Sequence, residues 1–324
     1  MKGYQFEDTQ GTFHLKKAEN ISYLYFPIAG EAGLKSSFTP NLGGDAKIDQ
    51  NTFLLEPVSA ENLVNNRNSR NFWCNVKGIG SWSLTGHSAE ELSKKFTEMQ
   101  DDSEVTAGFM WQKTTRESKK YQLRGEILSF IPVDKNVEIM LVTITNTGRM
   151  AQTVTPTAAI PLYGRSADNI RDHRHVTSLL HRIETTDTGV LVTPTLSFDE
   201  RGHQVNHMTY YCVGWSGNGE KPVDFYPTAE DFVGEGGNFE RPYAIVKNAE
   251  GVKAGTKIEG LEAVGGLHFS EITLEPEEEC SYLIFTGITE DIQEIRNLSK
   301  TYTTREKVLE ELEKTKAYWQ EKVN

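Results

Sequence analysis

The sequence predicts a mainly β protein, a large antiparallel β sandwich whose helices are confined almost entirely to the C-terminal end. Strand-like runs dominate the middle of the chain and follow one another after short breaks: EVTAGFMWQKT, KKYQLRGEILSFIP, NVEIMLVTITN and AQTVTPTAAIPLYG. Consecutive strands of this kind form antiparallel hairpins or meanders, whereas βαβ units need a crossover helix between strands. After residue 288 the pattern becomes helical. There is no fixed-period repeat and no clear linker before that point.

The composition is that of a globular protein with one large β domain or two ordinary domains. The chain has 324 residues, of which 37% are apolar and 25% charged. A net charge of −12 disfavours nucleic acid, because most of the surface would repel phosphates. No apolar run has the ~18 residues of a membrane span, and the N-terminus lacks the apolar segment of a secretory signal. We therefore expect a cytoplasmic protein with neither nucleic-acid nor membrane partners.

The first part of the chain contains short strands and one helix. Alternating runs between residues 4 and 26 are typical of antiparallel strands with one solvated face. A turn rich in glycine then precedes the apolar run FLLEPV at 53–58. A capping box at Ser88 and Glu91 predicts an amphipathic helix at about 88–100. Its apolar positions recur at helical spacing, at Leu92, Phe96 and Met99.

The last third of the chain returns to strands and ends in helices. The runs GVLVTPTLSF and MTYYCVGWS are predicted strands, and the looser stretch 217–260 is expected to lie on the surface. Two more strands and two helices, at about 290–299 and 304–322, complete the chain. The final helix has one apolar face, formed by Val308, Leu312 and Trp319. We therefore predict a β-sandwich domain at 1–288 and a helical segment at 289–324.

The polar loop at 163–182 is the candidate functional region. It reads YGRSADNIRDHRHVTSLLHR and holds three of the eight histidines, between two strand-like runs. Buried guanidinium and carboxylate groups need partners, so the loop either contacts something polar or is an ion-pair network. Arginine forks and Asp or Asn acceptors suit polyhydroxylated or anionic ligands. The candidate substrate-binding residues are Arg165, Asp168, Asn169, Arg171, Asp172, His173, Arg174 and His175.

Catalytic and metal-binding patterns are weak in this loop. Asp168 and Asp172 are close enough in sequence to form a glycosidase-type pair, but neighbouring arginines favour ion pairing over acid catalysis. No spacing fixes a metal site from His173, His175 and His181. The chain also lacks a GxSxG elbow and the glycine-rich nucleotide loops. We assign no catalytic residue, no metal and no cofactor.

Tryptophans and cysteines are expected to lie mostly in the core. Trp82, in the polar and glycine-flanked run SWSLTGH, is the best candidate for an exposed ring that stacks on a sugar. Three widely spaced cysteines without CxxC spacing argue against disulfides and zinc, and they are predicted to be small core residues: Cys74, Cys212 and Cys280.

Four long runs resemble the N-terminal β-sandwich of glycoside hydrolase family 94. They are FTPNLGGDAKIDQNTFLLEPVSAENL, SRNFWCNVKGIGSWSLTG, IPLYGRSADNIRDHRHVTSLLHRI and TPTLSFDERGH. The family contains inverting phosphorylases of disaccharides and oligosaccharides, and these runs look most like its 1,2-β-oligoglucan phosphorylase branch. The resemblance implies a super-β-sandwich of the galactose-mutarotase-like kind, followed by linker helices and an (α/α)6 barrel.

The resemblance also implies what this chain does not do. The family's general acid and most phosphate-binding residues lie in the barrel, and the chain ends where the linker would lead to it. Inorganic phosphate is the co-substrate of the complete enzyme. The sandwich is thus expected to serve in dimerisation and in completing the site for a β-linked gluco-oligosaccharide, as a homodimer or with a barrel-bearing partner chain. The alternatives are a stand-alone carbohydrate-binding or assembly module and a mutarotase-like enzyme.

Overall fold

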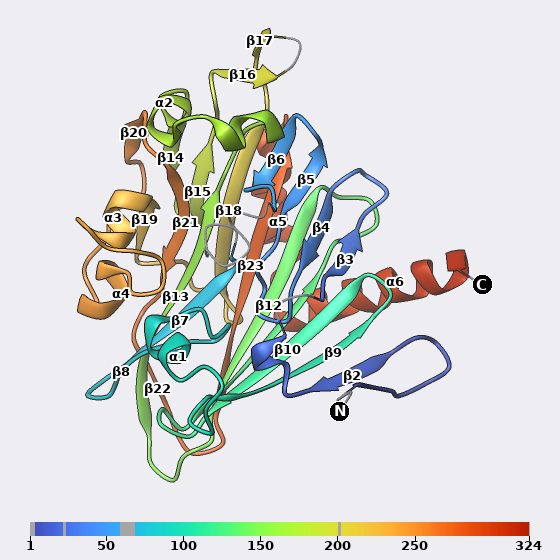
Figure 1. Cartoon of the computed structure of the whole chain (residues 1–324), viewed down its shortest axis with the longest axis vertical. Helices are drawn as coiled ribbons and strands as arrows, with labels where there is room; N and C mark the ends of the chain where they lie inside the picture. Colours follow the sequence, from blue (N-terminus) through green and yellow to red (C-terminus); the bar gives the residue numbers. More distant parts are fainter. Residues whose placement is uncertain (1–3, 22–23, 59–68, 200–201, 324) are drawn as a thin grey trace.

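A computed structural model describes residues 4–21, 24–58, 69–199 and 202–323, without the side chains of Arg171, His175 and Asp199. It confirms the mainly β fold: two large antiparallel sheets face each other across a common core (Figure 1). The larger sheet has eleven strands, in the spatial order β1 (Tyr4–Phe6), β2 (Phe13–Lys16), β9 (Asp102–Gly108), β10 (Trp111–Ser118), β11 (Leu123–Phe130), β12 (Val137–Asn146), β23 (Glu279–Thr289), β18 (Thr209–Ser216), β15 (Gly189–Val192), β14 (Arg182–Thr185) and β20 (Lys257–Glu259).

The other sheets are smaller. The facing sheet runs in the order β19 (Asp224–Thr228), β21 (Ala263–His268), β13 (Gln152–Leu162), β7 (Asn71–Val76) and β8 (Gly80–Ser83), with β22 (Ile272–Leu274) also paired to β13. A four-stranded sheet joins β3 (Phe26–Ala29), β4 (Lys35–Phe38), β5 (Ala46–Asp49) and β6 (Thr52–Leu55). A two-stranded hairpin, β16 (Leu196–Asp199) and β17 (Gly202–Val205), projects from one end of the molecule (Figure 1).

The helices cover the outer faces and one end of the sandwich. The α-helices are α1 (Ala89–Ser93), α2 (Arg174–Ser178), α3 (Ala229–Val233), α4 (Tyr243–Lys247), α5 (Ile292–Thr301) and α6 (Arg305–Val323). Two short 3-10 helices are η1 (Ala18–Asn20) and η2 (Ala167–Arg171). The two C-terminal helices lie where the sequence predicts them, within about two residues.

The core forms three layers because helices cover both sheets. In β12, Met140 and Val142 point into the space between the sheets, whereas Ile139 and Leu141 point to the outer face of the larger sheet. A strand with cover on both sides reads as a continuous apolar run, as NVEIMLVTITN does. On that outer face α5 and α6 pack against the sheet, through residues that include Val308 and Leu312. The apolar face of the last helix therefore covers its own domain.

Three predicted elements differ from the structure. The helix expected at 88–100 is limited to α1, and Leu92, Phe96 and Met99 are exposed rather than packed on the core. The run EVTAGFMWQKT is a hairpin of β9 and β10, with its turn at Met110 in the left-handed region (φ 61°). The run GVLVTPTLSF divides into β15 and β16, which belong to different sheets.

A buried ion pair joins the four-stranded sheet to the sandwich. Arg70 and Glu138 are each 1% exposed and form a bidentate contact, in which Arg70 Nη2 lies 3.0 Å from Glu138 Oε2. Arg70 also donates to the carbonyl oxygens of Gly44 at 2.9 Å and Asp45 at 3.2 Å. The guanidinium thus binds groups from two separate parts of the chain, as a buried charge requires.

Gly44 lies too close to the backbone of β4 to accommodate a side chain. Its φ is +151°, and a Cβ built there would lie 1.9 Å from the carbonyl oxygen of Ser37. We expect Gly44→Ala to lower the free energy of unfolding by about 2 kcal/mol, because the backbone must shift away from β4. Urea unfolding measures this. Gly78→Ala is the control, since Gly78 also has positive φ (+78°) but nothing within 4 Å of its Cβ position. Equal losses for the two variants would contradict the steric explanation.

Candidate functional site

The polar loop folds over one end of the sandwich. After β13, the chain continues through η2 and α2 before it enters β14 (Figure 1). The loop is tied down at its start, because the backbone of Phe53 donates to the carbonyl oxygen of Arg165 at 3.0 Å. The Ser166 hydroxyl donates to the carbonyl oxygen of Phe198 in β16, the first strand of the projecting hairpin. The element that extends from the body is therefore this hairpin, and the polar loop lies at its base.

The structure separates the predicted site residues into two groups. Arg165 and Asn169 are buried, and Arg174 is partly buried. Asp168, Asp172 and His173 are exposed. The side chains of Arg171 and His175 are not among those that the structure describes, so their predicted contacts lie outside it.

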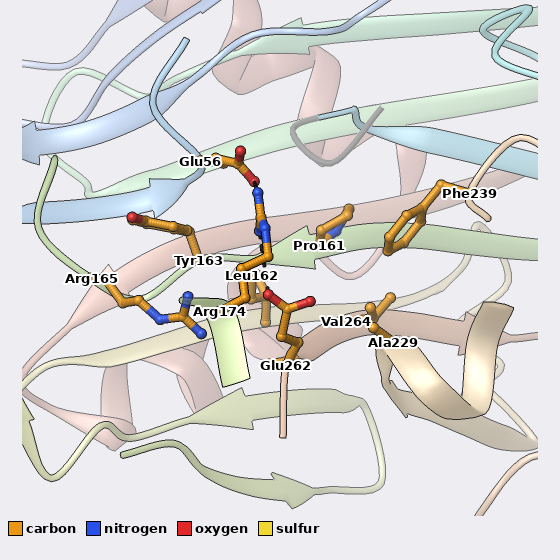
Figure 2. Close-up of a pocket in the computed structure, with 11 residues that line it drawn as sticks. Glu56, Pro161, Leu162, Tyr163, Arg165, Arg174, Ala229, Phe239, Glu262 and Val264 are labelled. Carbon is orange, nitrogen blue, oxygen red and sulfur yellow. Dashed lines mark hydrogen bonds and ion pairs between the residues drawn. The ribbon is translucent and has the colours of Figure 1, made fainter. Parts of the chain in front are cut away.

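Arg174 is the centre of an ion-pair network that reaches across the loop. Its Nη2 lies 2.5 Å from Glu56 Oε2, and its Nη1 lies 3.3 Å from Glu262 Oε1 (Figure 2). Glu56 follows β6 and Glu262 precedes β21, so the network joins three elements that are far apart in sequence. Neighbouring Asp172 instead accepts a hydrogen bond from the Asn169 amide at 2.8 Å. The carboxylates that pair with Arg174 are therefore two glutamates, and not the two aspartates that the sequence suggested.

Arg165 lies beside this network, and its buried charge is less well compensated than that of Arg174. Its guanidinium carbon is 5.2 Å from the centre of the Tyr163 ring, and the side chain is only 6% exposed. Burial lowers the pKa of Arg165 and raises that of Tyr163. Among the residues that the structure describes, neither Arg165 Nε nor the Tyr163 hydroxyl has a hydrogen-bond partner. Buried polar atoms normally find a partner, so these two atoms mark a place where an additional group would be stabilised.

The two arginines line a small pocket at the end of β13. The space open to water inside it is only about 20 Å³, which is room for roughly one water molecule. Its walls combine charged groups with apolar ones, and the aromatic ring on its far side belongs to Phe239 (Figure 2). The lining residues are Glu56, Pro161, Leu162, Tyr163, Arg165, Arg174, Ala229, Phe239, Glu262, Ala263 and Val264.

Sequence reasoning missed the acidic half of this pocket. Glu56 had a local signal: it is a charged residue within the apolar run FLLEPV, and charged residues are rarely buried unless paired. Glu262 and Phe239 had none, since both belong to the stretch that precedes β21 and meet Arg174 or its surroundings only in the folded chain. A pairing of this kind is visible only in three dimensions.

The expected exposed tryptophan is instead buried. Trp82 is 3% exposed, and its indole Nε1 donates to Asp101 Oδ2 at 2.7 Å. Its ring is therefore not a platform for a sugar. Cys74 and Cys212 are buried and Cys280 is partly buried, all three as free thiols, and burial raises the pKa of Cys212 to about 12.

The described part of the chain contains neither a candidate metal site nor a candidate membrane-spanning helix. Among its residues, no three His, Cys, Asp or Glu side chains come together in a way that could hold a metal ion. In the same residues no helix combines the length and apolar character needed to cross a bilayer.

Comparison with known proteins identifies the class of this domain and then its family. Residues 55–305 match the family model described as "Glycosyl hydrolase 94, supersandwich domain". The chain therefore belongs to the glycosyl hydrolase 94 family and represents a non-catalytic part of such a protein. No curated protein matches the chain.

Solved structures with a similar arrangement are distant in sequence. One is a putative aldose 1-epimerase from Escherichia coli K12, with 9% identity, 82% of this chain and 99% of that chain covered, and a TM-score of 0.44. Another is a bacterial glucoamylase complexed with acarbose, with 10% identity, 96% of this chain and 37% of that chain covered, and a TM-score of 0.42.

Proposed function

We propose that this chain is the sandwich portion of an inverting phosphorylase that acts on β-linked gluco-oligosaccharides, with β-1,2 linkages as the favoured substrate. In this role the arginine pocket completes a substrate site whose chemistry is supplied by a catalytic barrel. The chain joins that barrel within a homodimer or through a partner chain. Phosphate is the attacking nucleophile in such a reaction, so one acid on the barrel is sufficient and the sandwich needs none.

The single observation that carries this proposal is the incomplete state of the arginine pocket. It offers the buried Nε of Arg165 and the buried Tyr163 hydroxyl, neither of which has a hydrogen-bond partner in the described chain, next to carboxylates fixed by Arg174. Such donors and acceptors recognise sugar hydroxyls, and Phe239 supplies an apolar wall. Yet the pocket admits only about one water molecule. A subsite that is polar but too small for a sugar ring suits a surface that another domain completes.

The same observation disfavours the two alternatives as roles of this pocket. A stand-alone sugar-binding module needs a cavity that holds the ligand without help. A mutarotase-like reaction needs a histidine acid and a carboxylate base at one pocket, and none of the residues lining this pocket is a histidine.

A chimeric enzyme tests the proposal. In a full-length phosphorylase of this family whose sandwich is replaced by this chain, Arg165→Met and Arg174→Met should each raise the oligosaccharide KM about tenfold. Each change removes a charge-assisted hydrogen bond to the ligand or to the carboxylates that orient it. The KM for phosphate should stay the same. Arg182→Met is the matched control, because Arg182 pairs with Glu259 at 3.6 Å and lies outside the pocket.

The outcome that contradicts the proposal is an oligosaccharide KM that neither pocket variant changes. The same substitutions at the matching arginines of the unmodified enzyme give a second measurement if the chimera folds poorly. Sedimentation of the chimera tests dimerisation separately. If the pocket variants lose the dimer but keep the oligosaccharide KM, the pocket has no role in substrate binding.

A further inference from the structure

A second and much larger crevice lies on the opposite face of the sandwich, under α5. The arginine pocket includes Ala229 and Val264 from the outer layer of the six-stranded sheet. The crevice instead includes Val137, Tyr211 and Leu298 from the layer between the eleven-stranded sheet and the C-terminal helices. It holds about 400 Å³ of space for water, within the range of small-molecule sites.

The floor of this crevice is apolar and its rim is polar. The floor is formed by Val137, Leu298 and the buried ring of Tyr211, which α5 and the sheet hold in place. Gly287 leaves the space that the Tyr211 hydroxyl needs, because a Cβ at Gly287 would lie 2.4 Å from that oxygen. The rim residues come from α5 and from the turn before β12, and they are Asp134, Lys135, Asn136, Glu294, Asn297 and Thr301.

Two rim groups are fixed by hydrogen bonds that leave their other polar atoms available to a ligand. Asn136 Oδ1 accepts from the backbone of Leu34 at 2.9 Å, which orients its NH2 group as a donor. Glu294 Oε2 accepts from the Thr289 hydroxyl at 2.7 Å, which leaves the other carboxylate oxygen as an acceptor. The rim is therefore preorganised, with donors and acceptors at fixed positions around an apolar floor.

We propose that this crevice binds a neutral saccharide. A pyranose ring has hydroxyls around its edge and C–H groups on its faces, and this distribution matches a polar rim above an apolar floor. The charged rim residues are Asp134 and Glu294 against Lys135, and Lys135 Nζ already pairs with Asp134 Oδ1 at 2.9 Å. The small negative excess disfavours phosphate and other anions. The inference does not rest on the proposed role of the arginine pocket.

Calorimetry on the chain itself tests this site, with a β-1,2-linked glucose disaccharide, glucose and inorganic phosphate as probes. We expect millimolar binding of the sugars and no heat with phosphate. Asn297→Ala and Tyr211→Phe should each weaken sugar binding about fivefold, the effect of one lost hydrogen bond. Asn297 is exposed on α5, so its replacement leaves the fold intact. Gln293→Ala is the matched control, an exposed α5 residue outside the crevice.

Two results would overturn the proposal. One is the absence of sugar binding to the chain at any accessible concentration. The other is binding that Asn297→Ala and Tyr211→Phe leave unchanged. If Arg174→Met abolishes that binding instead, the sugar occupies the arginine pocket. A chimera whose KM depends on the arginines, together with a chain that binds no sugar, supports the proposed function and rejects this second site.

Discussion

Arg70→Met is expected to lower the free energy of unfolding by about 3–5 kcal/mol. The change removes a buried cation and leaves the Glu138 carboxylate, also 1% exposed, without its partner. An unpaired buried charge cannot recover its hydration energy, so breaking such a pair costs far more than the pair itself contributes. Urea unfolding followed by circular dichroism measures the loss.

The expected loss is large because Arg70 serves several partners at once. Its guanidinium also binds the carbonyl oxygens of Gly44 and Asp45, which lose a donor in the variant. The ring of Phe38 packs 4.9 Å from the guanidinium carbon. These contacts hold the turn before β5 against β7 and β12. A lysine at position 70 would keep the charge but lose the fork, so we expect Arg70→Lys to recover only part of the stability.

Two comparisons separate the buried charge from a general effect of losing arginine. Arg124→Met removes a surface ion pair with Glu117, where both side chains are 44% exposed, and should change stability by less than about 1 kcal/mol. The double variant Arg70→Met with Glu138→Leu should be more stable than Arg70→Met alone, because no charge is left unpaired. A loss below about 1 kcal/mol for Arg70→Met would contradict the explanation.

The sheet architecture was largely predictable because most strands are long and continuous in sequence. β12, β13 and β23 all coincide with apolar runs that the sequence marks clearly. The β9–β10 turn was hidden because its left-handed position is occupied by Met110, whereas the nearby Gly108 is the last residue of β9. Sequence patterns locate a strand well, but they do not locate a turn made from ordinary residues.

The helix at 88–100 shows the opposite failure. Its periodicity is present in the sequence, but α1 ends at Ser93, and Phe96 has a φ of 66°, which is incompatible with a right-handed helix. Phe96 and Met99 are 78% and 72% exposed, because no neighbouring surface covers this segment. Helical spacing produces a stable helix only when tertiary contacts bury its apolar face. The sequence has the apolar spacing of an amphipathic helix, but no other described part of the fold packs against its apolar face.

The candidate site was half predictable for a related reason. Arg165 and Arg174 are close in sequence to other polar residues, so the loop could be recognised from one stretch. The carboxylates that pair with Arg174, Glu56 and Glu262, lie beside strands that are distant in sequence and became visible only with the fold. The position of a loop relative to distant residues depends on sheet register, which a single sequence does not determine.

Stability should fall steeply as the pH is lowered from 7 to 5, because one buried histidine and one partly buried histidine are neutral in the folded chain. Burial, together with the nearby charge of Arg165, lowers the pKa of His181 to about 3. Burial, with Arg116 and Lys95 nearby, lowers the pKa of His87 to about 4. The ordinary histidine pKa is 6.5. Below pH 6.5 the unfolded chain therefore binds two protons that the folded chain does not.

The size of this effect follows from proton linkage. Each such histidine reduces the free energy of unfolding by about 1.4 kcal/mol per pH unit once the pH is well below 6.5. At pH 5 we expect a loss of about 2 kcal/mol per histidine and about 4 kcal/mol for both, relative to pH 7. The loss continues to lower pH and levels off near the folded-state pKa values. It is measured by urea unfolding at a series of pH values between 5 and 7, above the range where carboxylates titrate.

Variants assign the slope to these two residues. His87→Asn keeps a polar group near the Ser69 hydroxyl, which lies 2.8 Å from His87 Nδ1, and His181→Gln keeps a neutral polar side chain. Each should halve the difference in stability between pH 7 and pH 5, and the double variant should remove most of it. His207→Asn, at an exposed position, should leave the pH dependence unchanged. A wild-type stability that stays constant between pH 7 and 5 would mean that the imidazoles accept protons in the folded chain.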